Sequence, residues 1–479
     1  MATVRMRLGV APKERRRANP ARRAELGLVI FGSLIVTAAY ILVSIGTTSK
    51  VPPNLGVFLA IVLGLGLAAH IATRYLAPDA NPVVLPIVGL LNGLGYVTLA
   101  AIDQRALFPP QLQAMWTAVG VGFYVLTLVL VKRSRDLDRY RYLLLVAAVA
   151  LMLSPLVPHL GLAVGAYNES VRLWIHIGPI SGQPVELAKL LIVIFFASYF
   201  TEKREMLSIP TTRFGNRLVI DPRPLGPILL AWGFCMIVLA AERDVGFAVL
   251  VFVVFIAMLW MATGRGRYLV LGLGLFAAGT YGASRLFTQV DARVANWLHP
   301  WSRINLVGGS DQLVQGLYGL GSGGLVGTGV GFGHLSSIPL VGSDYIFAAF
   351  GTEWGLLGST TIVAAFALLV GAGLRIAQTA RSEFAKLAAA GFTIILGMQA
   401  FFIIGGIVNL LPSTGLTLPF MAYGGSSLVA NYILVALLMR ISDEGSRPMF
   451  SRAATATRIE PGSRTGPEPD PAPAAAQAT

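Results

Sequence analysis

The sequence predicts an all-α polytopic membrane protein, a helical bundle of about 12 transmembrane helices with a large extracytoplasmic loop. Hydrophobic residues make up 55% of the 479 residues and charged residues only 13%, whereas soluble domains carry about 25% charged residues. The mean hydropathy is +0.70, and long apolar stretches recur along most of the chain. The basic residues between these stretches fall mainly on alternate connections, as in proteins that cross a membrane many times.

Twelve apolar stretches are predicted to span the membrane. Most are about 20 residues long, which is the length that a helix needs to cross the hydrocarbon core of a bilayer. An even number of spans places both ends of the chain on the same side. The predicted spans are residues 25–46, 55–76, 83–102, 111–131, 141–158, 186–201, 225–241, 245–262, 268–287, 345–374, 387–410 and 419–440.

The 37 lysine and arginine residues divide unequally between the two sides that these spans define. Alternating the connections from the N-terminus puts 29 of them on one side and 8 on the other. Cytoplasmic loops carry an excess of Lys and Arg, so the richer side, with both termini, is predicted to be the cytoplasm. The net charge of +14 therefore reflects mainly topology, with attraction to anionic lipid headgroups in addition. No binding to nucleic acid is expected.

The same pattern divides the chain into four segments. Residues 1–24 form a basic cytoplasmic tail, and residues 25–158 hold the N-terminal transmembrane helices. Residues 159–440 form the membrane core, which includes an outer loop at 288–344. Residues 441–479 form a second cytoplasmic tail, and its Pro-, Ala- and Gly-rich end is expected to be disordered. We expect no cleavable signal peptide and no soluble domain.

Three outer connections are longer or more polar than joining two helices requires: residues 159–185, 288–344 and 411–418. The stretch "GLGSGG" at 319–324 matches G-x-G-x-x-G, but a dinucleotide site needs a strand before that motif and a βαβ unit around it. Here the surroundings are apolar helices and more glycine. We therefore expect an element in which backbone approaches backbone closely.

Charged residues near the outer ends of the spans have two interpretations each. Glu186 and Lys189 are three residues apart and share a helix face. They either form a local ion pair, or Lys189 binds an anionic head group while Glu186 orients it. Glu242, Arg243 and Asp244 lie in an outer hairpin, where they are either solvated turn residues or part of a site. Polar groups at membrane depth are costly unless they are used or paired, so both clusters are candidates.

Asp344 stands at the outer threshold of the predicted span 345–374. It either caps that helix by accepting hydrogen bonds from its first amides, or it is the group on which the chemistry depends. Glu353 follows nine residues later on the opposite helix face and is expected to contact another helix. The five histidines lack metal-ligand spacing, and the single cysteine, Cys235, lies in an apolar segment. Neither residue type predicts a metal site or a disulfide.

Five stretches of the sequence resemble the motifs of the SEDS (shape, elongation, division and sporulation) family, typified by RodA and FtsW. They occur in the family's order, and the last is long and specific, so the chain is identified as a member. The stretches are "VRLWI" at 171–175, "GQPVELAKL" at 182–190, "AERDVGFAVL" at 241–250, "GSDYIFAAFGTEWGLLG" at 342–358 and "LLPSTGLTLPFMAYGGSSLVANY" at 410–432.

The chain also departs from the family pattern. Val185 and Ala422 stand where the family usually has Ser, and Gly316 stands where Ser often follows Gln315. Five predicted spans precede the loop of Trp174, where the family core has three. The resemblance therefore implies a SEDS-type 10-helix core with two extra N-terminal helices, an arrangement similar to the actinobacterial RodA branch.

The resemblance implies a peptidoglycan glycosyltransferase that polymerises lipid II into glycan strands on the outer face of the bacterial cytoplasmic membrane. The reaction releases undecaprenyl pyrophosphate and serves wall synthesis for cell shape and elongation, or for division. It needs a base for the sugar hydroxyl that attacks the anomeric carbon, and cations for the pyrophosphate. Asp344 is the expected base, with Lys189, Arg243 and Arg172 on the same outer side. No cofactor is firmly predicted, but a divalent cation (Mg²⁺ or Mn²⁺) could accompany the pyrophosphate.

The positions that match the family motifs are the candidate substrate-binding residues. They are Arg172, Trp174, Gln183, Pro184, Glu186, Lys189, Glu242, Asp244, Glu353, Pro412, Thr414, Gly415, Tyr423, Gly424, Gly425, Ser426 and Ser427. The expected partners are a class B penicillin-binding protein that cross-links the strands and other elongation or division machinery, since the sequence predicts no transpeptidase fold.

Two functions from other classes compete with this hypothesis. A lipid II flippase without chemistry would carry polar residues through the interiors of several spans, as a path for the sugar head group. A scaffold for other cell-wall enzymes would need no such groups at all. The polar residues here cluster at the outer ends of the spans, which favours a catalyst on the outer face.

The charge pattern predicts the orientation of the chain. Reporter fusions at Pro210 and Gly309 should report opposite sides of the membrane, with Pro210 cytoplasmic, because they lie on connections of opposite class. If both fusions report the same side, the topology is wrong.

Overall fold

The computed structural model describes most of the chain between residues 20 and 447. Residues 1–19 and 448–479, which hold most of the two predicted tails, lie outside the described residues, as does most of the predicted span 225–241. The described ranges are 20–102, 109–157, 160–164, 171–177, 180–208, 212–214, 217–219, 244–286, 288–302 and 311–447, with six further positions between 226 and 237.

Eight helices within the described residues are long and apolar enough to cross a membrane. Each coincides with a span that the sequence predicted. They are α1 (Pro20–Thr48), α2 (Leu55–Leu76), α3 (Val84–Ala101), α4 (Pro110–Leu130), α9 (Val245–Thr263), α14 (Ile346–Thr379), α15 (Glu383–Ile407) and α16 (Gly425–Ser446). The prediction of an α-helical polytopic membrane protein is therefore confirmed.

The other predicted spans have more complex counterparts. α10 (Arg267–Leu286) and α11 (Thr288–Leu298) meet at 106°, and together they count as a possible ninth crossing. α6 (Arg141–Leu153), which follows the short α5 (Arg135–Arg139), is apolar but shorter, and α7 (Val185–Ser208) carries charges at both ends. Because 225–241 is largely undescribed, the total of twelve stays a prediction.

Short elements in the connections were not predicted from the sequence. β1 (Gly161–Val164), β2 (Val171–Ile177) and β3 (Ile180–Gly182) form an antiparallel sheet in that order, within the connection 159–185 that is predicted to be outer. β4 (Thr212–Phe214) and β5 (Arg217–Val219) form a second hairpin. In the loop 288–344, α11 is followed by α13 (Asp311–Gly323) and by a 3₁₀ turn at Leu335–Ser337. The bundle itself is helical throughout the described residues.

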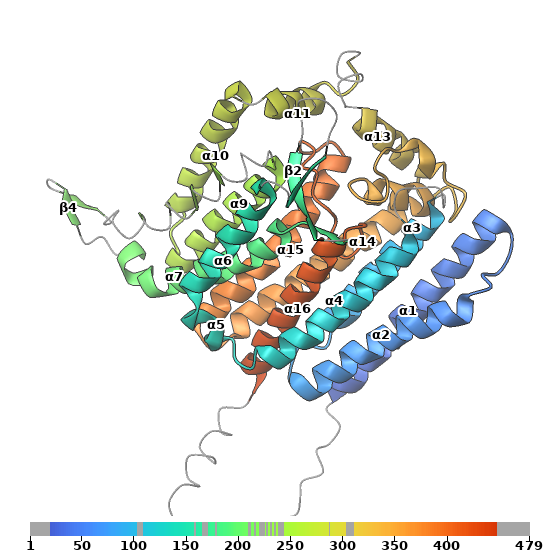
Figure 1. Cartoon of the computed structure of the whole chain (residues 1–479), viewed down its shortest axis with the longest axis horizontal. Helices are drawn as coiled ribbons and strands as arrows, with labels where there is room; N and C mark the ends of the chain where they lie inside the picture. The colour runs from blue at the N-terminus through green and yellow to red at the C-terminus, as the bar shows by residue number, and fades with distance from the viewer. Residues whose placement is uncertain are drawn as a thin grey trace, which may run out of the picture.

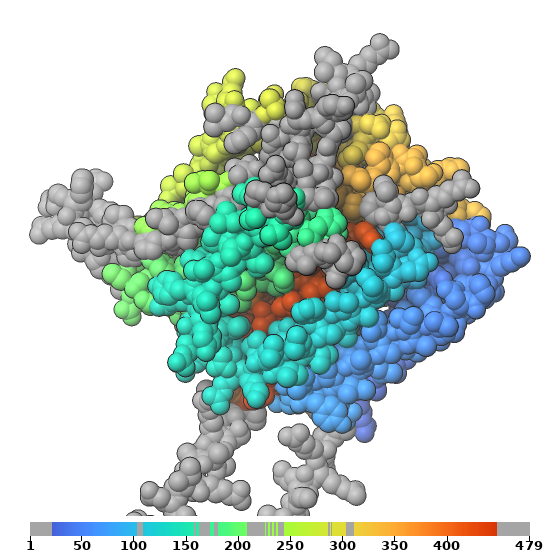
Figure 2. All heavy atoms as spheres, in the orientation of Figure 1, coloured from blue at the N-terminus to red at the C-terminus, as the bar shows by residue number. Residues whose placement is uncertain are grey.

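α15 and α16 lie at the centre of the bundle, while α1 and α2 form one flank (Figures 1 and 2). α16 packs along α4, and α15 packs between α14 and α7. In their most apolar stretches, 83% of the residues of α16 are buried, against 17% of those of α2. The last two helices of the chain therefore form the core on which the others pack.

Arg440 of α16 ties three helices together at one end of the bundle. Its guanidinium donates to the carbonyl oxygens of Val131 (2.7 Å), Leu76 (2.8 Å) and Leu128 (2.5 Å). These carbonyls lie at the C-terminal ends of α2 and α4, where the last turn of a helix has no partners of its own. One side chain thus satisfies groups that would otherwise be costly to bury.

α14 is interrupted at Gly355, which adopts φ 65° and ψ −163°. The break frees the amides that follow it from the helix. Leu356 and Leu357 donate instead to the carbonyl oxygens of Gly324 (3.0 Å) and Leu325 (3.1 Å). A break at membrane depth is tolerated where the protein supplies substitute hydrogen bonds in this way.

The carbonyls that the break leaves free accept hydrogen bonds from the same glycine-rich loop, residues 324–333. Thr328 donates its amide to the carbonyl of Thr352 at 2.9 Å, and Gly329 donates to that of Glu353 at 3.3 Å. At Gly327, a Cβ atom would lie 2.0 Å from the carbonyl oxygen of Glu353, so a side chain there is sterically excluded. The expected close approach of backbone to backbone is confirmed. The G-x-G-x-x-G stretch ends helix α13 and does not follow a strand, so it is not a dinucleotide motif.

The backbone at Gly355 predicts a large difference between two glycine substitutions in α14. Gly355→Ala should lower the melting temperature, because this region of φ/ψ space costs other residues about 1–3 kcal/mol and the new Cβ would lie 2.3 Å from the nitrogen of Gly327. Gly371→Ala is the control. Its Cβ meets nothing within 4 Å, and alanine stabilises a helix interior by about 0.5–1 kcal/mol. Equal melting temperatures in detergent would contradict the assigned break.

Candidate functional site

Asp344 precedes α14 without capping it. The N-cap position is occupied by Tyr345, whose side chain makes no capping hydrogen bond. The interpretation of Asp344 as a helix cap is therefore wrong. Its carboxylate is partly buried and lines a small pocket with Tyr345, with Phe402 and Ile403 of α15, and with residues 413–416.

The signature segment 410–432 holds Asp344 in place from the other side. The amide of Tyr423 donates to the carbonyl of Gly342 at 2.9 Å, and the side chains of Tyr345 and Ser413 are hydrogen-bonded. The cavity beside Asp344 has a volume of about 10 Å³, which is room for about one water molecule. A hydroxyl group in that position would contact the carboxylate of Asp344 directly.

Arg293 of α11 is a cation of this site that the sequence did not single out. Its Nη1 donates to the carbonyl oxygens of Ser413 (3.2 Å) and Thr414 (3.1 Å). Gly415, which has a φ of 69°, follows Thr414 in the sequence. A Cβ atom built there would lie 3.8 Å from Nη2 of Arg293 and 4.0 Å from Oδ2 of Asp344. The guanidinium and the carboxylate therefore flank the same glycine.

The environment of Asp344 suits a proton acceptor. Burial raises the pKa of its carboxyl group to about 6, and a hydrogen bond from Ser343 and the charge of Arg293 oppose that rise only in part. A general base is most effective when its pKa lies near the pH at which the enzyme works. Asp344 is still ionised at neutral pH but is a stronger base than an exposed aspartate.

Asp244 is the N-cap of α9 and is not a solvated turn residue. Its Oδ1 accepts the amide of Phe247 at 3.0 Å, and its side chain is buried. Burial raises the pKa of Asp244 to about 6, opposed in part by that amide and by Arg293. Oδ2 is buried without a hydrogen-bond partner. Glu242 and Arg243 lie outside the described residues.

Glu186 and Lys189 form the local ion pair that their spacing allows, at 2.5 Å, and each is 1% exposed. Nζ of Lys189 also donates to Oε1 of Gln399 on α15 at 2.9 Å. The side-chain Nε2 of Gln399 donates to the backbone carbonyl of Thr417 at 2.8 Å. The hydroxyl of Thr417 donates to the hydroxyl of Ser427 at 2.9 Å. A chain of polar contacts that is buried at Lys189 and half-buried at Thr417 thus joins α7, α15 and the signature segment.

The remaining motif residues of these segments meet at the start of α16. The amide of Gln183 donates to the hydroxyl of Ser426 at 2.9 Å, and Pro184 is buried beside it. Gly424 occupies the N-cap position of α16. A Cβ atom at Gly425 would lie 2.3 Å from the ring of Trp116, so glycine there lets α4 approach.

Two groups of candidates lie away from Asp344. Trp174 pairs with Leu162 in the small sheet, and Arg172 precedes it on β2, but the side chain of Arg172 lies outside the described part of the chain. Glu353 is 1% exposed, and its Oε1 accepts the amide of Gly331 at 2.9 Å. Its hydrogen-bond partner is therefore the glycine-rich loop at 324–333, and the expected contact with another helix stays a prediction. Pro412 and Thr414, by contrast, flank Ser413 beside the pocket.

A metal site made by the protein alone finds no support in the described residues. They contain no group of three His, Cys, Asp or Glu side chains placed to hold an ion. A divalent cation that the pyrophosphate itself brings stays a prediction.

The ion pair at Lys189 predicts a strong effect on folding. Lys189→Met should destabilise the protein by about 3–5 kcal/mol, because it leaves the buried carboxylate of Glu186 uncompensated. Combining it with Glu186→Gln should recover most of that loss. Lys386→Met is the matched control, since the i,i+3 pair of Lys386 with Glu383 is exposed and such pairs contribute about 0–1 kcal/mol.

Thermal unfolding in detergent measures all of these variants. Unchanged stability in Lys189→Met, or a double variant no more stable than Lys189→Met, would show that the pair does not support the fold.

Residues 83–447 match the family model of the FtsW, RodA and SpoVE cell cycle proteins. The peptidoglycan glycosyltransferase RodA of Mycobacterium tuberculosis is 38% identical over 441 residues, which cover 90% of this chain and 93% of that protein. The probable peptidoglycan glycosyltransferase FtsW of Geobacter metallireducens is 33% identical over 304 residues, covering 62% of this chain and 76% of that protein. The matched region begins just before α3, so α1 and α2 precede it, as expected for two extra N-terminal helices.

Two solved structures share the fold. A chain of a peptidoglycan synthase complex that coordinates polymerization and crosslinking aligns with a TM-score of 0.59 at 22% identity, covering 77% of this chain and 99% of that one. The crystal structure of the rod shape determining protein RodA of Thermus thermophilus aligns with a TM-score of 0.53 at 23% identity, covering 77% and 98%.

Proposed function

Because the chain belongs to the FtsW, RodA and SpoVE family of cell cycle proteins, we propose that it polymerises lipid II into glycan strands, with Asp344 as the general base. The peptidoglycan glycosyltransferase activity is that of relatives which align with nine-tenths of the chain. The choice of Asp344 rests on one observation: its carboxylate does not cap a helix, yet it is held between the signature segment and Arg293.

The proposed reaction joins two lipid-linked saccharides. The hydroxyl of the acceptor sugar on lipid II attacks the anomeric carbon of the donor, and the bond from that carbon to undecaprenyl pyrophosphate breaks. Asp344 takes the hydroxyl proton as the new glycosidic bond forms, which makes the attacking oxygen a better nucleophile. The pyrophosphate leaves with its negative charge. The donor glycan is now linked to the acceptor's saccharide and lipid carrier, and it is longer by the saccharide of one lipid II.

Arg293 is the described cation best placed to meet that negative charge. Its guanidinium lies within the influence of both Asp344 and Asp244, whereas Lys189 is committed to Glu186 and Gln399. Preorganised positive charge stabilises a leaving group at little cost in reorganisation. The other motif residues, from Gln183 to Ser427, are proposed to shape the surface that binds the two saccharides.

The reaction is proposed to occur on the outer face of the bacterial cytoplasmic membrane, with both termini in the cytoplasm. The charge division between the connections supports this orientation. Residues 159–440, with the loop 288–344, are the proposed catalytic core, and residues 1–24 and 441–479 are the proposed cytoplasmic tails.

The role of Asp344 predicts the behaviour of an asparagine variant. Asp344→Asn should lose about 10²-fold or more of the polymerisation rate, because asparagine cannot accept the proton. Parent activity should rise with pH through about 6, since the base must be ionised.

The same variant should not lose folding stability. Above pH 6 the buried carboxylate of the parent is ionised at a cost in stability, so the Asp344→Asn variant should melt at the same or a higher temperature than the parent. This difference should disappear at a pH low enough to protonate Asp344 in both the folded and the unfolded chain.

The assay uses purified protein in detergent with lipid II and detects glycan strands on a gel. A flippase without chemistry forms no glycosidic bond and gives no glycan strands in this assay. Asp311→Asn, at an exposed carboxylate of α13, is the control and should keep parent activity. If Asp344→Asn polymerises at near the parent rate, Asp344 is not the base, and Asp244 and Glu186 become the candidates.

A single-span class B penicillin-binding protein is the proposed partner. Glycan strands must be cross-linked, and no soluble transpeptidase domain is present among the described residues. The similarity to a chain of a synthase complex that couples polymerization to crosslinking supports this assembly. Purification at native expression in mild detergent should recover such a protein in a constant ratio. Repeated recovery of the chain without it would count against the partnership.

A further inference from the structure

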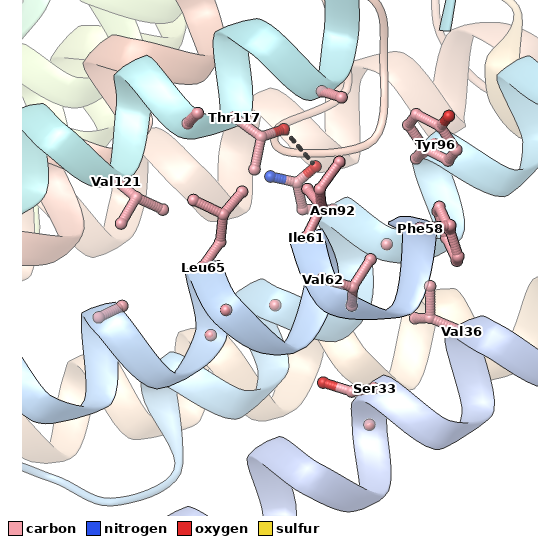
Figure 3. Close-up of a pocket in the computed structure, with 18 of the residues that line it drawn as sticks. Ser33, Val36, Phe58, Ile61, Val62, Leu65, Asn92, Tyr96, Thr117 and Val121 are labelled. Atoms are coloured by element: carbon pink, nitrogen blue, oxygen red, sulfur yellow. Dashed lines mark hydrogen bonds between the residues drawn. The ribbon is translucent and has the colours of Figure 1, made fainter. Parts of the chain in front are cut away.

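A large cavity lies among α1, α2, α3 and α4, away from the proposed reaction site (Figure 3). Its volume is about 680 Å³, within the range of about 300–1,000 Å³ that is typical of ligand sites. α1 packs on both α2 and α3, and α2 packs also on α4, so the four helices enclose the space. The cavity shares no lining residue with the pocket of Asp344. It is a separate feature of the molecule.

The lining of this cavity offers hydrocarbon almost everywhere. Figure 3 shows Val36, Phe58, Ile61, Val62, Leu65 and Val121 directed into it from three of the helices. Apolar cavities of this kind exclude water, because water finds no hydrogen-bond partners there. An occupant must therefore be apolar itself.

Four of the polar side chains in the lining, those of Ser33, Asn92, Thr117 and Tyr432, have hydrogen-bond partners within the protein. Asn92 donates to the hydroxyl of Tyr432 at 2.8 Å and accepts from Thr117 at 3.2 Å. The hydroxyl of Ser33 donates to the carbonyl of Val29 at 2.8 Å within its own helix. These groups are therefore not free to select a head group, a sugar or a phosphate. The other polar lining residues, Asn54, Tyr96 and Gln111, lie toward the end of the cavity beside the connection 49–54.

Glycine residues keep the cavity open. A Cβ atom at Gly64 of α2 or Gly89 of α3 would meet nothing within 4 Å, although both residues line the cavity. Glycine costs about 1 kcal/mol relative to alanine in a helix interior. At these two positions that cost is not explained by close packing of helices, because no neighbour lies within reach of a Cβ atom. Gly93 differs, because a Cβ there would lie 2.4 Å from the side chain of Val36 and glycine permits contact.

The length of the cavity matches one leaflet of a bilayer. Its lining runs from Val57 to Ala69 on α2, from Leu85 to Tyr96 on α3 and from Gln111 to Val121 on α4. At 1.5 Å per residue these segments are about 15–18 Å long. The hydrocarbon core of a bilayer is about 30 Å thick, so one leaflet contributes about half of that.

The cavity has an apolar side opening and a polar end. Val57 and Ile61 of α2 and Met115 of α4 line it and are also exposed on the surface of the bundle. Asn54 and Gln111, which are exposed and polar, line the end next to the connection 49–54. A hydrocarbon chain could enter sideways from the membrane while its polar end stays at the surface.

We propose that this cavity binds one acyl chain of a membrane phospholipid from the leaflet on the side of the connection 49–54. The head group lies beside Asn54 and Gln111, and the chain occupies the space between α2 and α3. The bound lipid thereby joins the two helices that precede the family-matched region to the core. The inference does not depend on the proposed catalytic activity.

Photolabelling of the full chain in lipid nanodiscs tests this proposal. One probe is phosphatidylglycerol with a diazirine in its acyl chain, and the other is a polyprenyl phosphate with a diazirine in its chain. Labelled peptides are located by mass spectrometry. Gly64→Leu with Gly89→Leu fills the cavity, and Gly122→Leu with Gly371→Leu is the matched control, because those glycines also face open space but do not line it.

The phospholipid probe should label the cavity-lining stretches of α2 and α4 in the parent and in the control pair, and that labelling should be lost in the filled pair. Preferential labelling by the polyprenyl probe, equal labelling in the filled pair, or no labelling of these stretches in the parent would each overturn the proposal. Should the filled pair fail to fold, the label map of the parent, competed with unlabelled phosphatidylglycerol, decides alone.

Discussion

The ammonium group of Lys189 is the constraint on which the arrangement around the site depends. A charge buried inside an apolar bundle is tolerated only when it is paired and hydrogen-bonded, and Lys189 achieves this with Glu186 on its own helix and Gln399 on α15. Gln399 can serve Lys189 only in one orientation, which directs its amide group toward Thr417. The need to satisfy one charge therefore fixes the signature segment against α7 and α15, and that segment in turn lines the pocket of Asp344.

A second constraint acts on the other side of Asp344. α14 begins just after this residue and breaks at Gly355, so the helix can hold Asp344 firmly only if the break is itself rigid. The glycine-rich loop provides that rigidity by accepting the amides of Leu356 and Leu357 and by donating to the carbonyls of Thr352 and Glu353. Glycine at position 327 is thus a packing requirement, because a Cβ atom there would lie 2.0 Å from the carbonyl oxygen of Glu353 and would separate the two backbones.

Long apolar runs predicted the spanning helices well, since span length and hydropathy are local properties of the sequence. The contacts of Arg293 could not be predicted in this way, because its partners Ser413 and Thr414 lie about 120 residues away and depend on the bend between α10 and α11. The break at Gly355 was hidden inside an apolar run that has the composition of a helix. Gln399, in contrast, carried a usable signal, since a glutamine in the middle of a predicted span needs a partner.

The basicity of Asp344 depends on how the charge of Arg293 is shared. A full ion pair with a guanidinium would lower the pKa of the carboxyl group and make it a weak base at neutral pH. Arg293 forms no salt bridge with Asp344. Its Nη1 donates instead to the carbonyls of Ser413 and Thr414, and its charge also acts on Asp244. Burial consequently outweighs the attraction, and the pKa of Asp344 stays raised at about 6. The two backbone carbonyls of the signature segment thus hold the cation near Asp344 without pairing it with the carboxylate, which is the arrangement that the proposed roles of both residues require.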